Sequence, residues 1–163
     1  MKTKDALKST MDISSMVLDS YISDMSDAEL MSRPSPSSNH LAWQLGHLIS
    51  SEVSLLESIC PGKAAELPAG FAEKHAKETV ANDDPRQFCT KEEYRALFQK
   101  VRASTLAALE GLSDADLDAP SPERFRQFVP TVGQLLTLIG THPMMHAGQF
   151  AVVRRVLGKP VLM

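Results

Sequence analysis

Four stretches of the chain carry apolar residues at every third or fourth position, and this spacing predicts four amphipathic α-helices. The stretches run from about 4 to 23, 38 to 59, 91 to 109 and 131 to 157. The stripe of the first stretch contains Leu7, Met11, Ser14, Val17, Leu18, Tyr21 and Met25. Alternating apolar and polar positions rich in β-branched residues are nearly absent, so we expect no β-strand.

Capping signals mark the ends of the last helix. Thr131 and Gln134 have the spacing of a capping box, in which each side chain binds the backbone N–H of the other residue. Gly158 and the following Pro160 are typical of a helix that ends just before them.

A short sequence occurs twice, as Met-Ser-Asp-Ala-Glu-Leu at 25–30 and as Leu-Ser-Asp-Ala-Asp-Leu at 112–117. Each copy follows a long predicted helix and precedes a proline-containing loop and another helix. Ser26 and Glu29 also have capping-box spacing, so each copy is expected to form one short helical turn. The chain thus divides into two helix–turn–helix halves, which predicts an all-α four-helix bundle.

The connection between the second and third helices, from about 60 to 90, is too long for a simple turn. It carries Pro61-Gly62 and Pro68-Ala69-Gly70. A connection of this kind is expected to be a crossover or to cover an open end of the bundle. It would allow the second and third helices to run parallel.

Length and charge narrow the class of protein. A chain of 163 residues is expected to form one domain, 1–163. The formal net charge of −3 argues against nucleic-acid binding, which needs clustered Lys and Arg. The strongest basic pair, Arg154-Arg155, is expected to be a solvated helix end.

The chain lacks the apolar runs of a membrane protein or a secretory signal, so we expect no membrane partner and a cytoplasmic location. Cys60 and Cys89 have no ligand pattern beside them. Both are expected to be free thiols that serve packing in a reducing compartment.

His142 and His146 carry the clearest chemical signal, because they lie four residues apart in a largely apolar run. On a helix such residues share a face, with Cβ atoms about 5–6 Å apart, so both imidazoles can reach one divalent metal ion. A buried neutral imidazole needs a partner, and a metal would supply it. Pro143 stands where an HExxH motif has its general base, which argues against a zinc protease.

A catalytic zinc-type site usually has a third protein ligand, and the second helix offers two candidates. His40 and His47 share a face with Trp43, Ser50 and Ser51. This face either meets solvent or lines a cavity, and Trp43 favours the cavity. The two histidines lie about 10 Å apart along the helix and cannot easily bind one ion. Spacing alone favours His47 only slightly.

Other polar residues are assigned simpler roles. His75, in a charged segment, is expected to be a solvated surface residue. Glu52 and Glu57 are either groups that support the metal ligands or ordinary surface charges, and the second interpretation is favoured. Gln149 is expected to lie beside the histidine pair, where it could orient a bound group. No catalytic general base is identifiable.

These features resemble the DinB-like superfamily of metal-binding four-helix bundles. The resemblance rests on Leu-Ala-Trp-Gln-Leu-Gly-His-Leu at 41–48, His-Pro-Met-Met-His-Ala-Gly-Gln at 142–149 and Arg-Arg-Val-Leu-Gly at 154–158. It implies an up–down–down–up bundle with a long crossover between helices two and three. It also implies a divalent ion, commonly zinc or nickel, held by His47, His142 and His146, which decides against His40.

The resemblance and the histidines lead to two functional expectations. The first is a metal-dependent enzyme that acts on a small molecule, either as a thiol-dependent S-transferase using a low-molecular-weight thiol or as a hydrolase. Trp43, Gln149, Ser50 and Ser51 are then expected to line or support the pocket. The second is a non-catalytic metal-stabilised module that binds a ligand or forms a homodimer.

Overall fold

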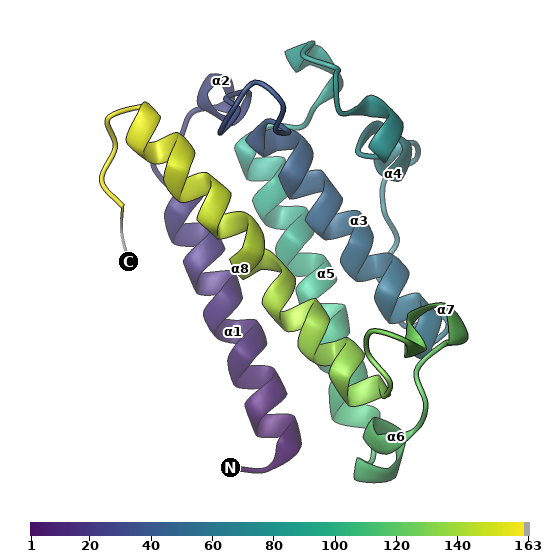
Figure 1. The fold of residues 1–163 in the computed structure, drawn as a ribbon. Coiled ribbons are helices and arrows are strands. Elements are labelled where there is room, and N and C mark those ends of the chain that lie inside the picture. The colour runs from purple at the N-terminus through teal and green to yellow at the C-terminus, as the bar shows by residue number, and fades with distance from the viewer. Residues whose placement is uncertain (162–163) are drawn as a thin grey trace.

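The computed structural model describes residues 1–161 and is built around four long helices (Figure 1). These helices are α1 (Thr3–Ile22), α3 (Leu41–Ile59), α5 (Lys91–Gly111) and α8 (Val132–Val156). Six short elements connect them: α2 (Asp27–Leu30), α4 (Phe71–Lys74), η1 (Lys77–Thr79), η2 (Pro85–Gln87), α6 (Asp114–Asp118) and α7 (Glu123–Arg126). Extended pairing among the described residues is limited to an isolated bridge between Pro120 and Thr131. The all-α prediction is therefore confirmed.

The predicted order of helix directions is also confirmed. In Figure 1, α1 and α8 run in one direction and α3 and α5 in the opposite one, which is an up–down–down–up bundle. Two contacts fix α1 parallel to α8. A Cβ placed on Gly140 would lie 3.3 Å from Met11 Cγ, and farther along both helices Arg154 donates to the Tyr21 carbonyl. The crossover carries α4, η1 and η2.

Local hydrogen bonds at the helix ends follow the sequence signals. Capping boxes form at Thr131–Gln134, Ser26–Glu29 and Ser113–Asp116. Gly158 follows α8 with φ +71°, a left-handed conformation that glycine adopts without steric cost. These short-range signals could be predicted because each involves residues only a few positions apart.

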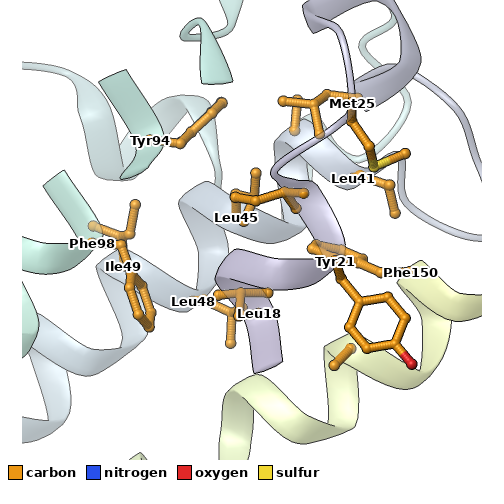
Figure 2. Packing of buried hydrophobic residues seen from close by; sticks show 14 of the residues in the cluster. Leu18, Tyr21, Met25, Leu41, Leu45, Leu48, Ile49, Tyr94, Phe98 and Phe150 are labelled. Atoms are coloured by element: carbon orange, nitrogen blue, oxygen red, sulfur yellow. The ribbon is translucent and has the colours of Figure 1, made fainter. Parts of the chain in front are cut away.

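The core lies between the four long helices, and Figure 2 shows its closely packed side chains. Every residue of the predicted α1 stripe is buried. The first turns of α3 are buried nearly all round, from Leu41 to Gly46, which makes α3 the central helix at that level. Apolar burial of this extent is the dominant stabilising contribution in a helical bundle.

Two expectations of surface charge are wrong. Arg154 is fully buried, donates to the carbonyls of Tyr21 (2.8 Å) and Pro160 (2.7 Å), and pairs with Asp24. Its hydrogen bond to Asp24 lowers the pKa of that carboxyl group. Glu52 is buried beside Arg102 of α5. Neither burial was predictable, because each depends on a charged partner from a distant segment.

Two further expectations concern membrane-spanning helices and the cysteine thiols. None of the helices described here has both the length and the apolar character needed to cross a membrane. Cys60 and Cys89 are both free and half-buried, which confirms the prediction that they form no disulfide.

Candidate metal centre

Three histidines from two helices converge near the middle of α8. His47 comes from α3, and His142 and His146 come from α8, one turn apart. One ring nitrogen of each lies within 4.8 Å of the others. The ring centroid of His47 lies 5.2 Å from that of His142 and 5.5 Å from that of His146. The structure therefore brings together the three residues that the sequence singled out as ligands.

The spacing of the two α8 histidine nitrogens suits a tetrahedral ion. Zinc–nitrogen bonds of about 2.0–2.1 Å at tetrahedral angles place two ligand nitrogens about 3.3–3.4 Å apart. The Nε2 atoms of His142 and His146 lie 3.3 Å apart. The donor set, three imidazoles without a carboxylate, is one that zinc and nickel both accept.

Gln44 fixes the ring of His146 in the state that a metal ligand needs. Its side-chain N–H donates to the Asn39 carbonyl (2.7 Å), so its Oε1 atom faces His146 and accepts from Nδ1 (2.8 Å). Nδ1 then carries the proton and Nε2 presents a lone pair. A carbonyl oxygen that holds the far nitrogen of a ligand histidine is a regular feature of metal sites.

Sequence reasoning missed Gln44 and selected Gln149 instead. Gln44 is buried, whereas Gln149 is exposed on α8. The available signal was the position of Gln44 on α3, one turn before His47. Its partner lies 102 residues away, so only the folded chain shows the contact.

The indole ring of Trp43 packs against the face of the His47 ring. The two rings are stacked, with centroids 5.1 Å apart and planes 7° from parallel. The indole N–H is shared between Thr79 Oγ1 (3.1 Å) and the Ala76 carbonyl (3.2 Å), both in the crossover. Trp43 therefore connects the position of His47 to the position of the crossover.

Burial keeps all three histidines neutral near pH 7. It lowers the pKa of His142 and His146 to about 4, with a smaller contribution from the neighbouring histidines, and it lowers the pKa of His47. A neutral imidazole has a free lone pair, so protons do not compete with a metal at neutral pH.

A cavity of about 610 Å³ opens beside the histidines. Its wall includes His47, His142, Ser50, Ser51, His75 and Arg124. The serines come from the α3 face that was predicted either to meet solvent or to line a cavity. A volume of this size is typical of a small-molecule site.

His40 and His75 stand outside the histidine cluster. His40 is the N-cap residue of α3: its Nδ1 accepts from Trp43 N–H (3.0 Å), and its Nε2 donates to the Asn82 carbonyl (3.1 Å). The prediction that His75 is a solvated surface residue is wrong, because only 2% of it is exposed. His75 Nδ1 donates to the Phe71 carbonyl (2.7 Å), and Nε2 accepts from the Tyr94 hydroxyl (2.7 Å).

His75 gives the metal-free protein a pH-dependent stability. Burial lowers its pKa to about 4, whereas an unfolded histidine titrates near about 6.5. As the pH falls through this window the unfolded chain binds a proton that the folded chain does not, so the free energy of unfolding falls by up to about 3 kcal/mol. Urea unfolding at a series of pH values measures this slope. His75→Asn is expected to make it shallower, and an unchanged slope in that variant would contradict the assignment.

The fold and the histidine cluster together define a helical bundle with a candidate metal centre. A sequence model of the DinB superfamily matches residues 11–150. The chain belongs to the DinB superfamily, and the resemblance inferred from the two histidine-containing motifs is confirmed.

Two solved structures share this fold. One is described as a conserved protein from Enterococcus faecalis, with a TM-score of 0.72, 19% identity, and coverage of 98% of this chain and 99% of the other. The second is YfiT from Bacillus subtilis, with a TM-score of 0.64, 19% identity, and coverage of 96% and 89%. YfiT is described as a probable metal-dependent hydrolase with an unusual four-helix bundle topology. None of the curated proteins compared with the chain matches it.

Proposed function

We propose that the protein is a divalent-metal-dependent enzyme of the hydrolase type that acts on a small molecule. His47, His142 and His146 would hold the ion, with zinc or nickel as the expected metals. The observation that carries the proposal is the convergence of three neutral imidazoles beside a cavity of small-molecule size. A purely structural zinc site usually has four protein ligands, whereas three leave a position open for chemistry.

The residues around the cluster have separable roles. Gln44 keeps Nε2 of His146 free of a proton, and Trp43 fixes the ring plane of His47. When bound, a divalent ion supplies Lewis acidity and lowers the pKa of a water or thiol ligand toward neutral. No Asp or Glu is among the described residues of the cavity wall, so this wall offers no carboxylate as a general base.

The description of YfiT as a probable metal-dependent hydrolase supports the hydrolytic version for a protein of the same fold. The three-histidine centre would also accept a thiolate ligand. Thiol-dependent transfer therefore remains a prediction, and the same assay tests it. A homodimer, a cytoplasmic location and the lack of nucleic-acid binding stay predictions as well.

The test is a turnover screen with metal-loaded protein. Carboxylate and phosphate esters probe hydrolysis, and epoxides with cysteine or glutathione probe thiol transfer. We expect turnover in the zinc- or nickel-loaded wild type and none in metal-free protein or in His142→Ala. His40→Asn is the matched control: asparagine is a good N-cap residue, so this variant is expected to keep its activity.

Two outcomes would contradict the proposal. Equal turnover with and without metal would remove the metal from the reaction. Metal that raises Tm without any turnover across the panel would favour the non-catalytic module, in which the histidines only join α3 to α8.

A further inference from the structure

The cavity beside the histidines has an unusual charge pattern. Arg124 of α7 is the only Asp, Glu, Lys or Arg among the described residues that line it. The wall is therefore cationic through Arg124, and a divalent ion would add to this charge. A cavity of one sign with apolar walls attracts ligands of the opposite sign.

Arg124 is available to a ligand. It is exposed, and among residues 1–161 no carboxylate lies within ion-pair distance of it. Its guanidinium carbon lies 4.5 Å from the centroid of the neighbouring Phe125 ring, which also lines the cavity. Stacking on an aromatic ring leaves the N–H groups at the guanidinium edge free to donate.

A second observation points to a polar ligand. The Ser50 hydroxyl is buried and has no hydrogen-bond partner among the described residues. A buried polar group without a partner is costly, and most are satisfied by protein, water or a ligand. Ser50 lies in the cavity wall on the same α3 face as Ser51 and Ser54. Rotation of its side chain would give the buried hydroxyl a partner on a polar ligand in the cavity.

The positions of the helices set the length of that ligand. His47 lies in the N-terminal half of α3, while α7 lies beside the C-terminal end of α3 (Figure 1). The α3 residues in the cavity wall run from His47 to Leu55, a rise of about 12 Å along the helix axis. A molecule of several carbon atoms can therefore reach Arg124 and the histidines at once.

We propose that the cavity takes a small organic substrate with an oxyanion group, and that Arg124 binds this group while the reacting end of the molecule lies at His47 and His142. The guanidinium group matches a carboxylate or a phosphate through two parallel N–H donors. The assignment of the reacting end depends on the proposed metal-dependent function. The binding of an anion by Arg124 does not.

The first arm of the test uses full-length protein loaded with cobalt(II), whose thiolate charge-transfer absorption reports binding at the metal. The probes are 6-mercaptohexanoate, 6-mercaptohexylphosphonate and the neutral 6-mercaptohexanol. In the wild type we expect at least one acidic probe to bind about tenfold more tightly than the alcohol, as hydrogen bonds to a charged group permit. A preference for one of the acids identifies the oxyanion.

Two variants make this arm specific. Arg124→Gln is expected to reduce the advantage of the acidic probes to within about twofold, because the neutral amide loses the charge and the paired donors. Arg155→Gln makes the same change of charge at an exposed α8 residue outside the cavity wall, and is expected to keep the full advantage. Equal binding of acids and alcohol by the wild type, or an advantage that survives in Arg124→Gln, would overturn the proposal.

The second arm separates this proposal from the metal-dependent function. Metal-free protein is titrated with hexanoate and 1-hexanol and followed by ligand NMR. A preference for hexanoate that disappears in Arg124→Gln supports the anion site even if the protein takes up no cobalt. No preference in the wild type counts against the anion site even if cobalt binds.

Discussion

Replacing Glu52 with leucine is expected to lower the free energy of unfolding by about 3–5 kcal/mol. Glu52 accepts from Arg102 Nη2 (2.9 Å) and from Thr105 Oγ1 (2.7 Å) in the interior. The side chains of Glu52 and Arg102 are 4% and 6% exposed. Without Glu52, a guanidinium group that cannot lose its proton remains buried without its anionic partner.

The same pair is expected to contribute little net stability. Burial raises the pKa of Glu52 and lowers that of Arg102, so in both cases desolvation outweighs the attraction between the two groups. Nε and Nη1 of Arg102 also have no hydrogen-bond partner among the described atoms. The double variant Glu52→Leu/Arg102→Met is therefore expected to lie within about 2 kcal/mol of the wild type, since apolar replacements of buried pairs are often neutral.

Urea unfolding followed by circular dichroism measures these differences. Lys8→Ala removes one member of the exposed Lys8–Asp12 pair and is the matched control, with an expected loss below about 1 kcal/mol. Two results would contradict this prediction. One is a loss of unfolding free energy in Glu52→Leu no larger than that in Lys8→Ala, and the other is a double variant no more stable than Glu52→Leu alone.

Gly46→Ala is expected to destabilise the protein by about 3 kcal/mol or more, at the upper end of the range for overpacked interiors. A Cβ on Gly46 would lie 2.0 Å from Cδ2 of His75. The His75 ring has little room to move, because it contacts Phe71 at 4.4 Å between ring centroids and is hydrogen-bonded through both nitrogens. Displacing it would break these bonds and shift the crossover beside His47.

Gly148→Ala is the control for this prediction, because a Cβ there meets no atom within 4 Å. Gly148 lies inside α8, where alanine is the better helix former by about 1 kcal/mol. The control is therefore expected to be neutral or stabilising in the same unfolding experiment. Similar effects of the two substitutions would show that the close approach of Gly46 to His75 does not matter.

The sequence was sufficient for features that depend on neighbouring positions. Periodicity predicted the four long helices, and the spacing of Ser26 from Glu29 and of Thr131 from Gln134 predicted capping boxes that form. The separation of His142 and His146 also predicted that they share a helix face. For His47 spacing was insufficient, because His40 lies on the same face, and the choice came from the family resemblance.

The interior polar contacts could not be predicted in this way. Glu52 meets Arg102 across 50 residues of sequence, Gln44 meets His146 across 102, and Arg154 meets Asp24 across 130. A charged or amide side chain resembles a surface residue until its partner is known. His75 was misassigned for the same reason, because the crossover folds back over α3 and turns one residue of a charged segment inward.

The metal content of the purified protein tests the central claim most directly. Elemental analysis of untagged protein, purified without a chelator, is expected to give about one zinc or nickel per chain, as a three-histidine site requires. His47→Ala and His142→Ala are expected to lose the metal, and His40→Asn is expected to keep it. A wild type without stoichiometric metal, even after reloading, would contradict the account, as would equal metal content in the wild type and both alanine variants.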